Sequence, residues 1–181
     1  MATREPDEAL VARCRGGDAR AFRTLVERYQ RPLYNAAYRV LGNAEDARDV
    51  IQAAFMEVSQ RLDGFDPGRR FFSWIYRIAL NAALNAARRN RRQAELPAGE
   101  LVAEGAGPDG GLVEEERARR IQAALDRLSA DDRAVLTLRH FDELSYRDIA
   151  EVLGLEEKTV KSRLFEARQR LRALLAGQEA A

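Results

Sequence analysis

The sequence predicts an all-α protein made of two small helical domains joined by a flexible linker. Apolar residues recur at helical spacing over most of the 181-residue chain, and no stretch alternates like a strand between turn residues. The periodicity stops between Gln93 and Glu116, where proline, glycine and acidic residues gather without a basic residue. We therefore expect domains over residues 1–95 and 117–181, separated by an acidic linker over residues 96–116.

Eight helices are expected from this periodicity. They span residues 7–15, 18–41, 44–63, 71–92, 114–128, 131–141, 145–153 and 157–175. In the second helix, Pro32 should end or kink the chain, because proline lacks the N–H that a helix interior uses. Asn43 is a good cap for the third helix. The fourth packs Trp74, Ile75 and Ile78, so helices two to four can form a small core.

The overall charge indicates little about partners, because the chain has a formal net charge of only +1. All its basic residues except Lys158 and Lys161 are arginines. Arginine suits bidentate contacts to phosphate and guanine, but a GC-rich genome also produces this bias. The composition therefore leaves the kind of partner open.

A single cysteine, Cys14, excludes an internal disulfide framework, and a single histidine, His140, leaves no zinc cluster. We expect neither a metal nor another cofactor. Cys14 lies on an amphipathic segment where a small buried residue is common, with a redox role as the alternative. No apolar run approaches the ~20 residues of a membrane span, and the amino terminus has no apolar signal core. We expect a cytoplasmic protein without membrane insertion.

The last third of the chain has a helix-turn-helix pattern, with Ser145 as a cap and Gly154 at the corner. One stripe of the second helix is apolar and should be buried: Val160, Leu164, Ala167, Leu171 and Leu174. The outward face carries cations together with Phe165. A basic stripe alone is often only a solvated face. The phenylalanine among the cations favours DNA, because an apolar base edge can cover it.

A second candidate surface is the short connection Phe65–Arg70, which carries two arginines and lies among aromatic residues. Unstacked bases of a single strand gain ~1–3 kcal/mol each by stacking on aromatic side chains, while cations follow the phosphates. The alternative is that Phe71, Trp74 and Phe65 belong to the core, whereas Phe72 and Tyr76 lie off the core stripe.

Four stretches in this order resemble the bacterial RNA polymerase sigma factors of the extracytoplasmic-function (ECF) group. They are Asp46–Phe55 (DARDVIQAAF), Phe71–Asn81 (FFSWIYRIALN), Leu144–Ala150 (LSYRDIA) and Thr159–Arg163 (TVKSR). The resemblance covers nearly the whole chain. It implies a region 2-like bundle over residues 1–95 that binds core RNA polymerase and opens the promoter at its minus-ten element. It also implies a region 4-like helix-turn-helix domain over residues 117–181 that recognises the minus-thirty-five element.

The resemblance assigns roles by position. Asp49 and Gln52 resemble the contacts to the polymerase clamp. The single-strand set, which would melt the promoter and hold a flipped base, is Phe65, Arg69, Arg70, Phe71, Phe72, Trp74 and Asn81. The duplex set is Arg139, Lys158, Thr159, Lys161, Ser162, Arg163, Phe165 and Arg168. The family catalyses no reaction, and the expected partners are core RNA polymerase, promoter DNA and an anti-sigma factor.

The chain departs from the family pattern in three places. Ala53 and Ala54 replace a Glu-Thr type pair, which can weaken the clamp contact. The loop Asp66–Arg70 replaces an Arg-Gly-x-Ser-type loop that is more usual in the family. The resemblance therefore does not indicate which DNA base this loop captures. Glu166 occupies a position where the family frequently has a basic residue. Its negative charge is unfavourable beside phosphate unless the side chain points away.

Three other functions compete with a sigma factor. A sigma-like decoy that binds only an anti-sigma protein should have lost the outward cations and Phe165. A helix-turn-helix repressor would need neither the first domain nor the loop. An enzyme is the weakest alternative, since the sequence has no glycine-rich phosphate loop and no nucleophile with a defensible base.

Overall fold

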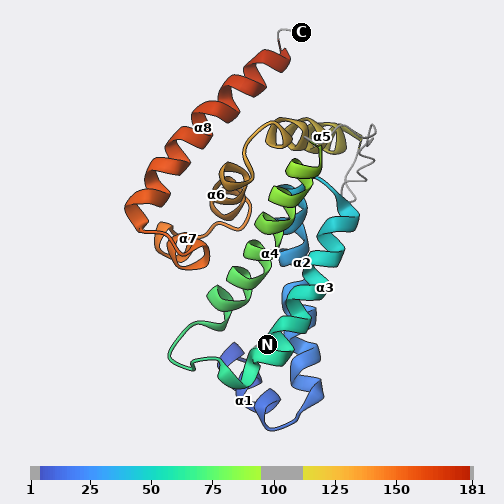
Figure 1. The fold of residues 1–181 in the computed structure, drawn as a ribbon, viewed down its shortest axis with the longest axis vertical. Helices are drawn as coiled ribbons and strands as arrows, with labels where there is room; N and C mark the ends of the chain where they lie inside the picture. Colours follow the sequence, from blue (N-terminus) through green and yellow to red (C-terminus); the bar gives the residue numbers. More distant parts are fainter. Residues whose placement is uncertain (1–4, 95–111, 180–181) are drawn as a thin grey trace.

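The computed structural model describes residues 5–94 and 112–179, and every regular element within these ranges is helical. The elements are α1 (Asp7–Arg15), α2 (Ala19–Leu41), α3 (Ala44–Arg61), the short 3-10 turn η1 (Leu62–Gly64), α4 (Phe71–Ala94), α5 (Leu112–Asp126), α6 (Ala130–His140), α7 (Tyr146–Leu153) and α8 (Glu157–Glu179). Figure 1 shows their arrangement. The all-α prediction is confirmed, with helices close to the expected ranges.

Side-chain caps determine where several helices begin. The Asn43 side chain accepts hydrogen bonds from the backbone N–H groups of Glu45 and Asp46 at the start of α3, at 2.8 and 3.0 Å. Ser145 accepts from the N–H of Asp148 at the start of α7, at 3.1 Å. These caps satisfy backbone donors that have no partner within the helix.

The helix expected over residues 18–41 is present as α2 (Ala19–Leu41), and Pro32 lies inside it, so of the two expected effects the end of the helix at Pro32 does not occur. Proline removes one backbone hydrogen bond from the helix. Buried residues on both sides of Pro32, Tyr29 and Leu33 among them, pack α2 against its neighbours. Packing along the whole length thus keeps the two halves in one helix.

Helix α4 lies at the centre of the molecule. It packs against α2 and α3, and it also packs against α6 and α7. Its buried residues therefore lie on more than one face, and Ile75, Leu80 and Ala83 are all nearly inaccessible. A helix that is apolar around most of its circumference requires cover on opposite sides.

The two helical groups consequently share one continuous hydrophobic core. The sequence suggested modules kept apart by a slack connection, whereas in the structure α6 packs on α2 and α4, and α7 packs on α4. Helix α5 begins at Leu112, two residues before the helix expected from residue 114. Residues 96–111 of the expected linker lie outside the described residues.

The helix-turn-helix prediction is confirmed at its corner. Gly154 ends α7 with a φ of 66°, a left-handed conformation that glycine adopts readily. Val160, Leu164 and Ala167 of α8 are buried as expected, while Leu171 and Leu174 are half-buried. The carboxyl-terminal part of α8 extends away from the other helices (Figure 1). Across residues 5–94 and 112–179, no helix combines the length and apolarity that crossing a membrane demands.

Candidate nucleic-acid interface

The outward face of α8 presents most of the expected duplex set to solvent, while the remaining member, Arg139, lies half-buried on α6. Phe165 is 64% exposed, which is the largest exposure of a big apolar side chain in the described part of the chain. Lys158, Lys161, Ser162 and Arg168 are exposed beside it, whereas Thr159 and Arg163 are half-buried. The structure therefore brings an aromatic ring and several cations together on a surface that the core does not use.

Tyr146, which the sequence did not single out, orders two members of the duplex set. The Arg139 guanidinium lies 5.1 Å from the centre of the Tyr146 ring, and the Lys161 ammonium lies 5.7 Å from it. Arg139 also donates a hydrogen bond to the Leu144 carbonyl at 2.8 Å. Cations near an aromatic face are held by the charge distribution of the ring. The sequence signal for this role was the position of Tyr146, an aromatic residue directly after the cap Ser145 in the helix-turn-helix.

The cation Arg168 is held by a histidine. Its Nε donates to Nε2 of His140 at 3.1 Å. Burial, and then the charges of Arg168 and Arg139, lower the pKa of His140, so the imidazole is neutral and can accept this bond. This hydrogen bond links Arg168 of α8 to His140 at the end of α6.

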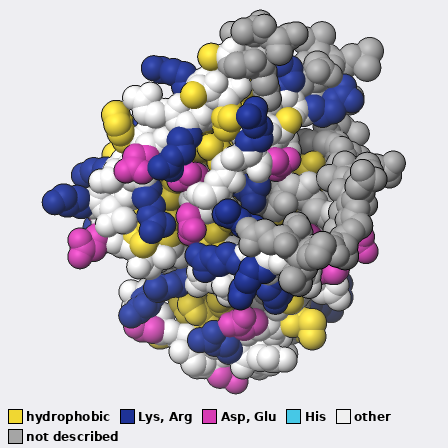
Figure 2. All heavy atoms as spheres, turned by 45° about the horizontal axis from the view of Figure 1, so that its top comes forward, with side chains coloured by type: hydrophobic (Ala, Val, Ile, Leu, Met, Phe, Trp, Pro, Cys, Tyr) yellow, Lys and Arg dark blue, Asp and Glu magenta, His cyan; other side chains and the backbone are white. Residues whose placement is uncertain are grey.

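Glu166, the acidic departure from the family pattern, is compensated within the helix. Its carboxylate lies 3.0 Å from Arg170, which in turn lies 2.7 Å from the largely buried Asp132 of α6. The Glu166 carboxylate thus forms an ion pair with Arg170, which offsets its negative charge beside the cations of the duplex set. Figure 2 shows one face of the molecule, on which Lys and Arg side chains are numerous and interspersed with fewer acidic ones.

The aromatic residues of the first half are placed differently. Phe65 and Phe71 are only 4% and 0% exposed, and their rings pack edge to face at 5.7 Å. Trp74 is half-buried against both, at 4.9 and 5.7 Å between ring centres. In this conformation Phe65 and Phe71 support the loop from within and present no free face for a base. This is the alternative that the sequence analysis left open for them.

Phe72 and Tyr76 were expected off the core stripe. Phe72 is half-buried, but Tyr76 is only 3% exposed. Burial, and then the charge of Asp142 in the segment after α6, raise the pKa of the Tyr76 hydroxyl. The expectation was therefore wrong for Tyr76, because α4 has neighbours on more than one side and a residue away from the first apolar stripe can still be buried.

The loop itself is held by an arginine from α1. Arg15 donates hydrogen bonds to the backbone carbonyls of Leu62 (3.1 Å), Asp63 (3.0 Å) and Phe65. At the loop tip, Asp66 accepts from the Gly68 N–H at 2.9 Å. No sequence signal pointed to Arg15, because its partners are backbone groups about 50 residues away in the chain.

Arg69 and Arg70 are exposed at the end of this loop, as expected. Arg69 lies 3.7 Å from Asp66, whereas Arg70 forms an ion pair at 2.5 Å with Asp148 of α7. Asn81 does not join them. It lines a hollow of about 180 Å³ between the two helical groups, together with Arg163 of the duplex set. The structure thus separates Asn81 from the loop and brings it to α8.

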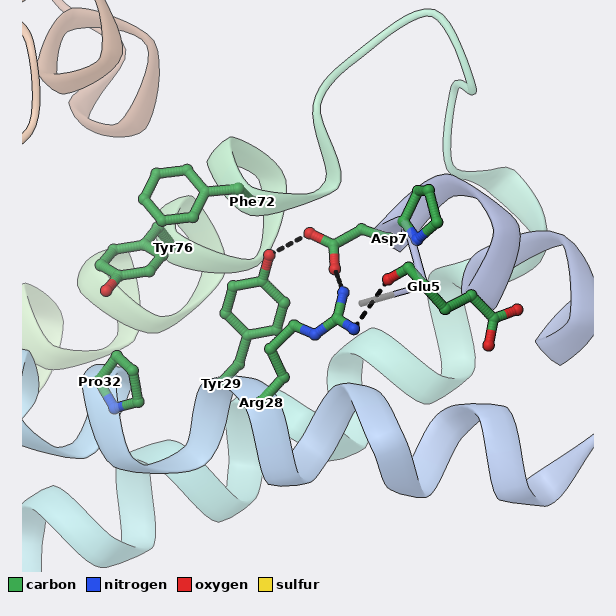
Figure 3. Close-up of a pocket in the computed structure, with 8 residues that line it drawn as sticks. Glu5, Asp7, Arg28, Tyr29, Pro32, Phe72 and Tyr76 are labelled. Atoms are coloured by element: carbon green, nitrogen blue, oxygen red, sulfur yellow. Dashed lines mark hydrogen bonds and ion pairs between the residues drawn. The ribbon is translucent and has the colours of Figure 1, made fainter. Parts of the chain in front are cut away.

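A second hollow, of about 440 Å³, lies beside the start of α4 and was not foreseen (Figure 3). On one wall Asp7 accepts a hydrogen bond from the Tyr29 hydroxyl and forms an ion pair with Arg28. On the other wall the rings of Phe72 and Tyr76 lie 4.4 Å apart. The network ties α1 to α2 and shapes the surface next to the loop.

The proposed polymerase contacts Asp49 and Gln52 are exposed on α3. They are three residues apart, so they lie on one face of the helix. The adjacent Ala53 is also exposed. This face is available for a partner.

Comparison with known proteins identifies both halves of the chain. Residues 25–93 match the profile of Sigma-70 region 2, and residues 118–171 match that of Sigma-70, region 4. The chain is 36% identical over 183 residues to the RNA polymerase sigma-H factor of Pseudomonas aeruginosa, with 93% of each protein covered. It is 33% identical over 176 residues to the ECF RNA polymerase sigma factor SigW of Bacillus subtilis, covering 91% of this chain and 94% of that protein.

Solved structures give the same result. The chain is similar to CnrH in its complex with the cytosolic domain of CnrY, with a TM-score of 0.73, 32% identity and coverage of 96% of this chain and 99% of that one. It is also similar to the sigma factor RpoE of Bartonella quintana in complex with the anti-sigma factor NepR. That comparison has a TM-score of 0.71, 26% identity and coverage of 86% and 96%.

Proposed function

This chain belongs to the extracytoplasmic-function group of bacterial RNA polymerase sigma factors, and we propose how its parts divide the work of a promoter-specific initiation factor. Proteins of this family direct transcription initiation and are not enzymes. Residues 1–95 bind core RNA polymerase and the melted minus-ten strand. Residues 117–181 recognise the minus-thirty-five duplex, and residues 96–116 connect the two. The protein acts in the cytoplasm, together with the polymerase.

The observation that best supports the duplex role is the exposed Phe165 among the cations of α8. Leaving this ring in water is unfavourable, and an apolar base edge in the major groove would cover it. Lys161 and Arg168 lie on the same side and can reach phosphate or guanine. A decoy that never touches DNA gives no reason for this arrangement.

For the melted strand, Arg69, Arg70, Phe72 and Trp74 are the members of the single-strand set with accessible surface at or near the loop. We assign them to the strand itself. The cations can follow phosphates, and the two partly exposed rings can stack on bases. Phe65 and Phe71 act by holding this surface in shape from the core.

Run-off transcription tests the function directly. The purified chain, added to purified core polymerase, should start transcription at a cognate promoter found by selection from a random promoter library. A chain that starts transcription at no promoter would contradict the proposal, and if it also failed to bind the polymerase it would fit the decoy that binds only an anti-sigma protein.

The polymerase contact has its own test. Replacing Asp49 and Gln52 together by alanine should weaken co-purification with core polymerase. Glu27→Ala is the matched control, because Glu27 is an exposed acid on α2. Unchanged co-purification of the double variant would place the contact elsewhere.

An anti-sigma factor is the expected protein partner. CnrH and the Bartonella RpoE were solved with CnrY and the anti-sigma factor NepR, respectively. Because this chain has the same fold at similar TM-scores, we propose that it too is bound by such a protein. Co-expression with candidate anti-sigma genes, followed by affinity purification, tests this point.

A further inference from the structure

The hollow beside the start of α4 takes no part in the function proposed above, apart from the ring of Phe72. Its volume of about 440 Å³ lies within the ~300–1,000 Å³ range of small-molecule sites. Residues at the start of α1, in the middle of α2 and in the first turns of α4 line it (Figure 3). One wall is polar and the other is aromatic. The hollow therefore has the two kinds of surface that bind a flat ring with polar edges.

The polar wall is centred on the carboxylate of Asp7. This carboxylate forms an ion pair with Arg28 and accepts a hydrogen bond from the hydroxyl of Tyr29. Arg28 also donates to the backbone carbonyl of Glu5, at 2.8 Å. The side chains of Asp7 and Arg28 are 17% and 10% exposed, so the pair is largely buried and still lines the hollow. A carboxylate has about four acceptor sites, and these two bonds leave room for a donor from a ligand.

The aromatic wall is formed by Phe72 and Tyr76 of α4. Their ring centres lie 4.4 Å apart, and the ring of Tyr29 lies 6.3 Å from that of Phe72. Tyr29 and Tyr76 are almost completely buried, whereas Phe72 is half-buried and keeps accessible surface. A flat ring can therefore stack on Phe72 while its polar edge points towards Asp7.

A cation lies at the rim of this hollow. The guanidinium of Arg70 is 5.8 Å from the ring centre of Phe72. Arg70 is paired with Asp148, but the arginine side chain is 63% exposed, and a phosphate accepts from a guanidinium in the same way as a carboxylate. A base in the hollow would thus have a cation beside the phosphate to which it is linked.

We propose that this hollow is a nucleobase site that selects bases with an exocyclic amino group. The ring stacks on Phe72, the amino group donates to Asp7, and the attached phosphate binds Arg70. The proposal rests on the proposed function, in which this end of α4 meets single-stranded DNA, and it adds Asp7 as a residue that determines specificity.

The four bases differ at the group that would meet Asp7. Adenine, cytosine and guanine carry an exocyclic amino group, whereas thymine presents carbonyl oxygens and no amino group. A carbonyl oxygen beside the carboxylate would bring two acceptors together without a donor. The gain or loss of one hydrogen bond to a charged acceptor should change the affinity roughly tenfold.

The test uses the full chain and a matched pair of bases. 5-Methylcytosine and thymine have the same ring size and the same methyl group, but the first has an amino group where the second has a carbonyl oxygen. Two fluorescent oligonucleotides are short runs of thymidine, and one of them has a single 5-methylcytosine at its centre. Fluorescence anisotropy should show that the natural chain binds this one more tightly, by roughly tenfold.

Asp7→Asn should remove this preference. An amide oxygen has two acceptor sites, which Arg28 and Tyr29 would occupy, and the amide N–H group cannot accept from the base. Glu8→Gln changes the net charge equally at an exposed acid in the same helical turn, and it should keep the preference. Phe72→Leu should lower the preference as well, because the base loses its stacking surface.

A measurement on the natural chain keeps the test independent of folding, because Asp7→Asn also weakens the network that ties α1 to α2. A strand with 5-iodocytosine at its centre is photocrosslinked to the chain, and the attachment site is read by peptide mass spectrometry. We expect attachment to Phe72 or to the tyrosines beside it. Attachment only to Trp74 would place the base at the loop and overturn the site.

The base could belong to a DNA strand or to a free nucleotide, and competition separates these sources. Deoxycytidine monophosphate and thymidine monophosphate are titrated against the fluorescent strand that contains 5-methylcytosine. Stronger competition by the cytidine nucleotide would show that the site accepts a free nucleotide. A preference within the strand without such competition, which we expect, would make DNA the ligand.

Equal affinity of the natural chain for the two strands, with equal competition by the two nucleotides, would overturn the nucleobase site. Failure to bind either strand would overturn it as well, and so would a preference that survives in a folded Asp7→Asn variant. Run-off transcription separates the two levels. If the natural chain supports transcription but shows no preference, only the nucleobase site fails. If it supports none at any promoter, the proposed function fails.

Discussion

The two candidate surfaces differ in how far the sequence could define them. On α8, one face is buried against α6 and α7 and the other is free, so helical periodicity separates core from surface correctly. On α4, neighbours pack on opposite sides, so most of its circumference is buried. On such a helix, an aromatic residue can lie outside the apolar stripe seen in the sequence and still be buried. Tyr76 is an example.

An aromatic residue predicted from the sequence to be exposed indicates a binding surface only where no other helix packs on its side. Phe165 is informative because no neighbour covers its side of α8. Phe65 and Phe71 have the same chemistry, but they fill the space beneath the loop. Four sets of variants test this contrast.

The largest effect is expected from paired replacement of a buried and an exposed phenylalanine. Phe71→Ala should lower the free energy of unfolding by about 3–5 kcal/mol, because it leaves a cavity in the core. Phe165→Ala should change it by less than about 0.5 kcal/mol and weaken duplex binding instead. Urea denaturation of both variants measures the difference. Equal loss of stability would show that Phe165 is part of the core.

A smaller loss of stability is expected when the support of the loop is removed. Arg15→Ala deletes three hydrogen bonds to loop carbonyls and should lower the free energy of unfolding by about 1–2 kcal/mol. It should also weaken single-strand binding without changing duplex binding by the second domain. Arg23→Ala, an exposed arginine on α2, is the control. Loss of duplex binding alone would contradict this division.

Asp142, in the segment that follows α6, should make the stability of the folded chain depend on pH. Burial raises the pKa of this carboxyl to about 6, against the opposing charge of Arg39. The folded state therefore favours the protonated form, and it loses stability as the pH rises from the ordinary pKa of an aspartate through about 6.

Asp142→Asn removes this titration. The variant should be close to the natural chain near pH 4 and more stable by about 2–3 kcal/mol at pH 7. Urea denaturation at both pH values measures the difference, with Glu27→Gln as the control. A variant that is less stable at pH 7 would mean that the attraction to Arg39 outweighs burial.

The smallest effect is expected at the exposed end of the duplex set. Arg168→Ala should lower run-off transcription by roughly tenfold at limiting promoter, since one contact to guanine or phosphate is lost. Its binding to core polymerase should be unchanged. Arg23→Ala again serves as the control. Loss of polymerase binding together with transcription would indicate that α8 contacts the enzyme rather than the DNA.

The sequence alone determined the helices, their caps, the corner at Gly154 and the exposed face of α8. These features depend on local chemistry: a cap side chain bonds to nearby N–H groups, and one buried stripe leaves the opposite face free. The four family stretches also identified the kind of protein.

Only the tertiary structure decided what covers α4, what holds the loop and where Asn81 lies. Arg15 acts on carbonyls far away in the chain, and Asp131 and Asp148 act on arginines of the other domain. Such contacts depend on how separate helices pack, and local periodicity carries no information about their partners.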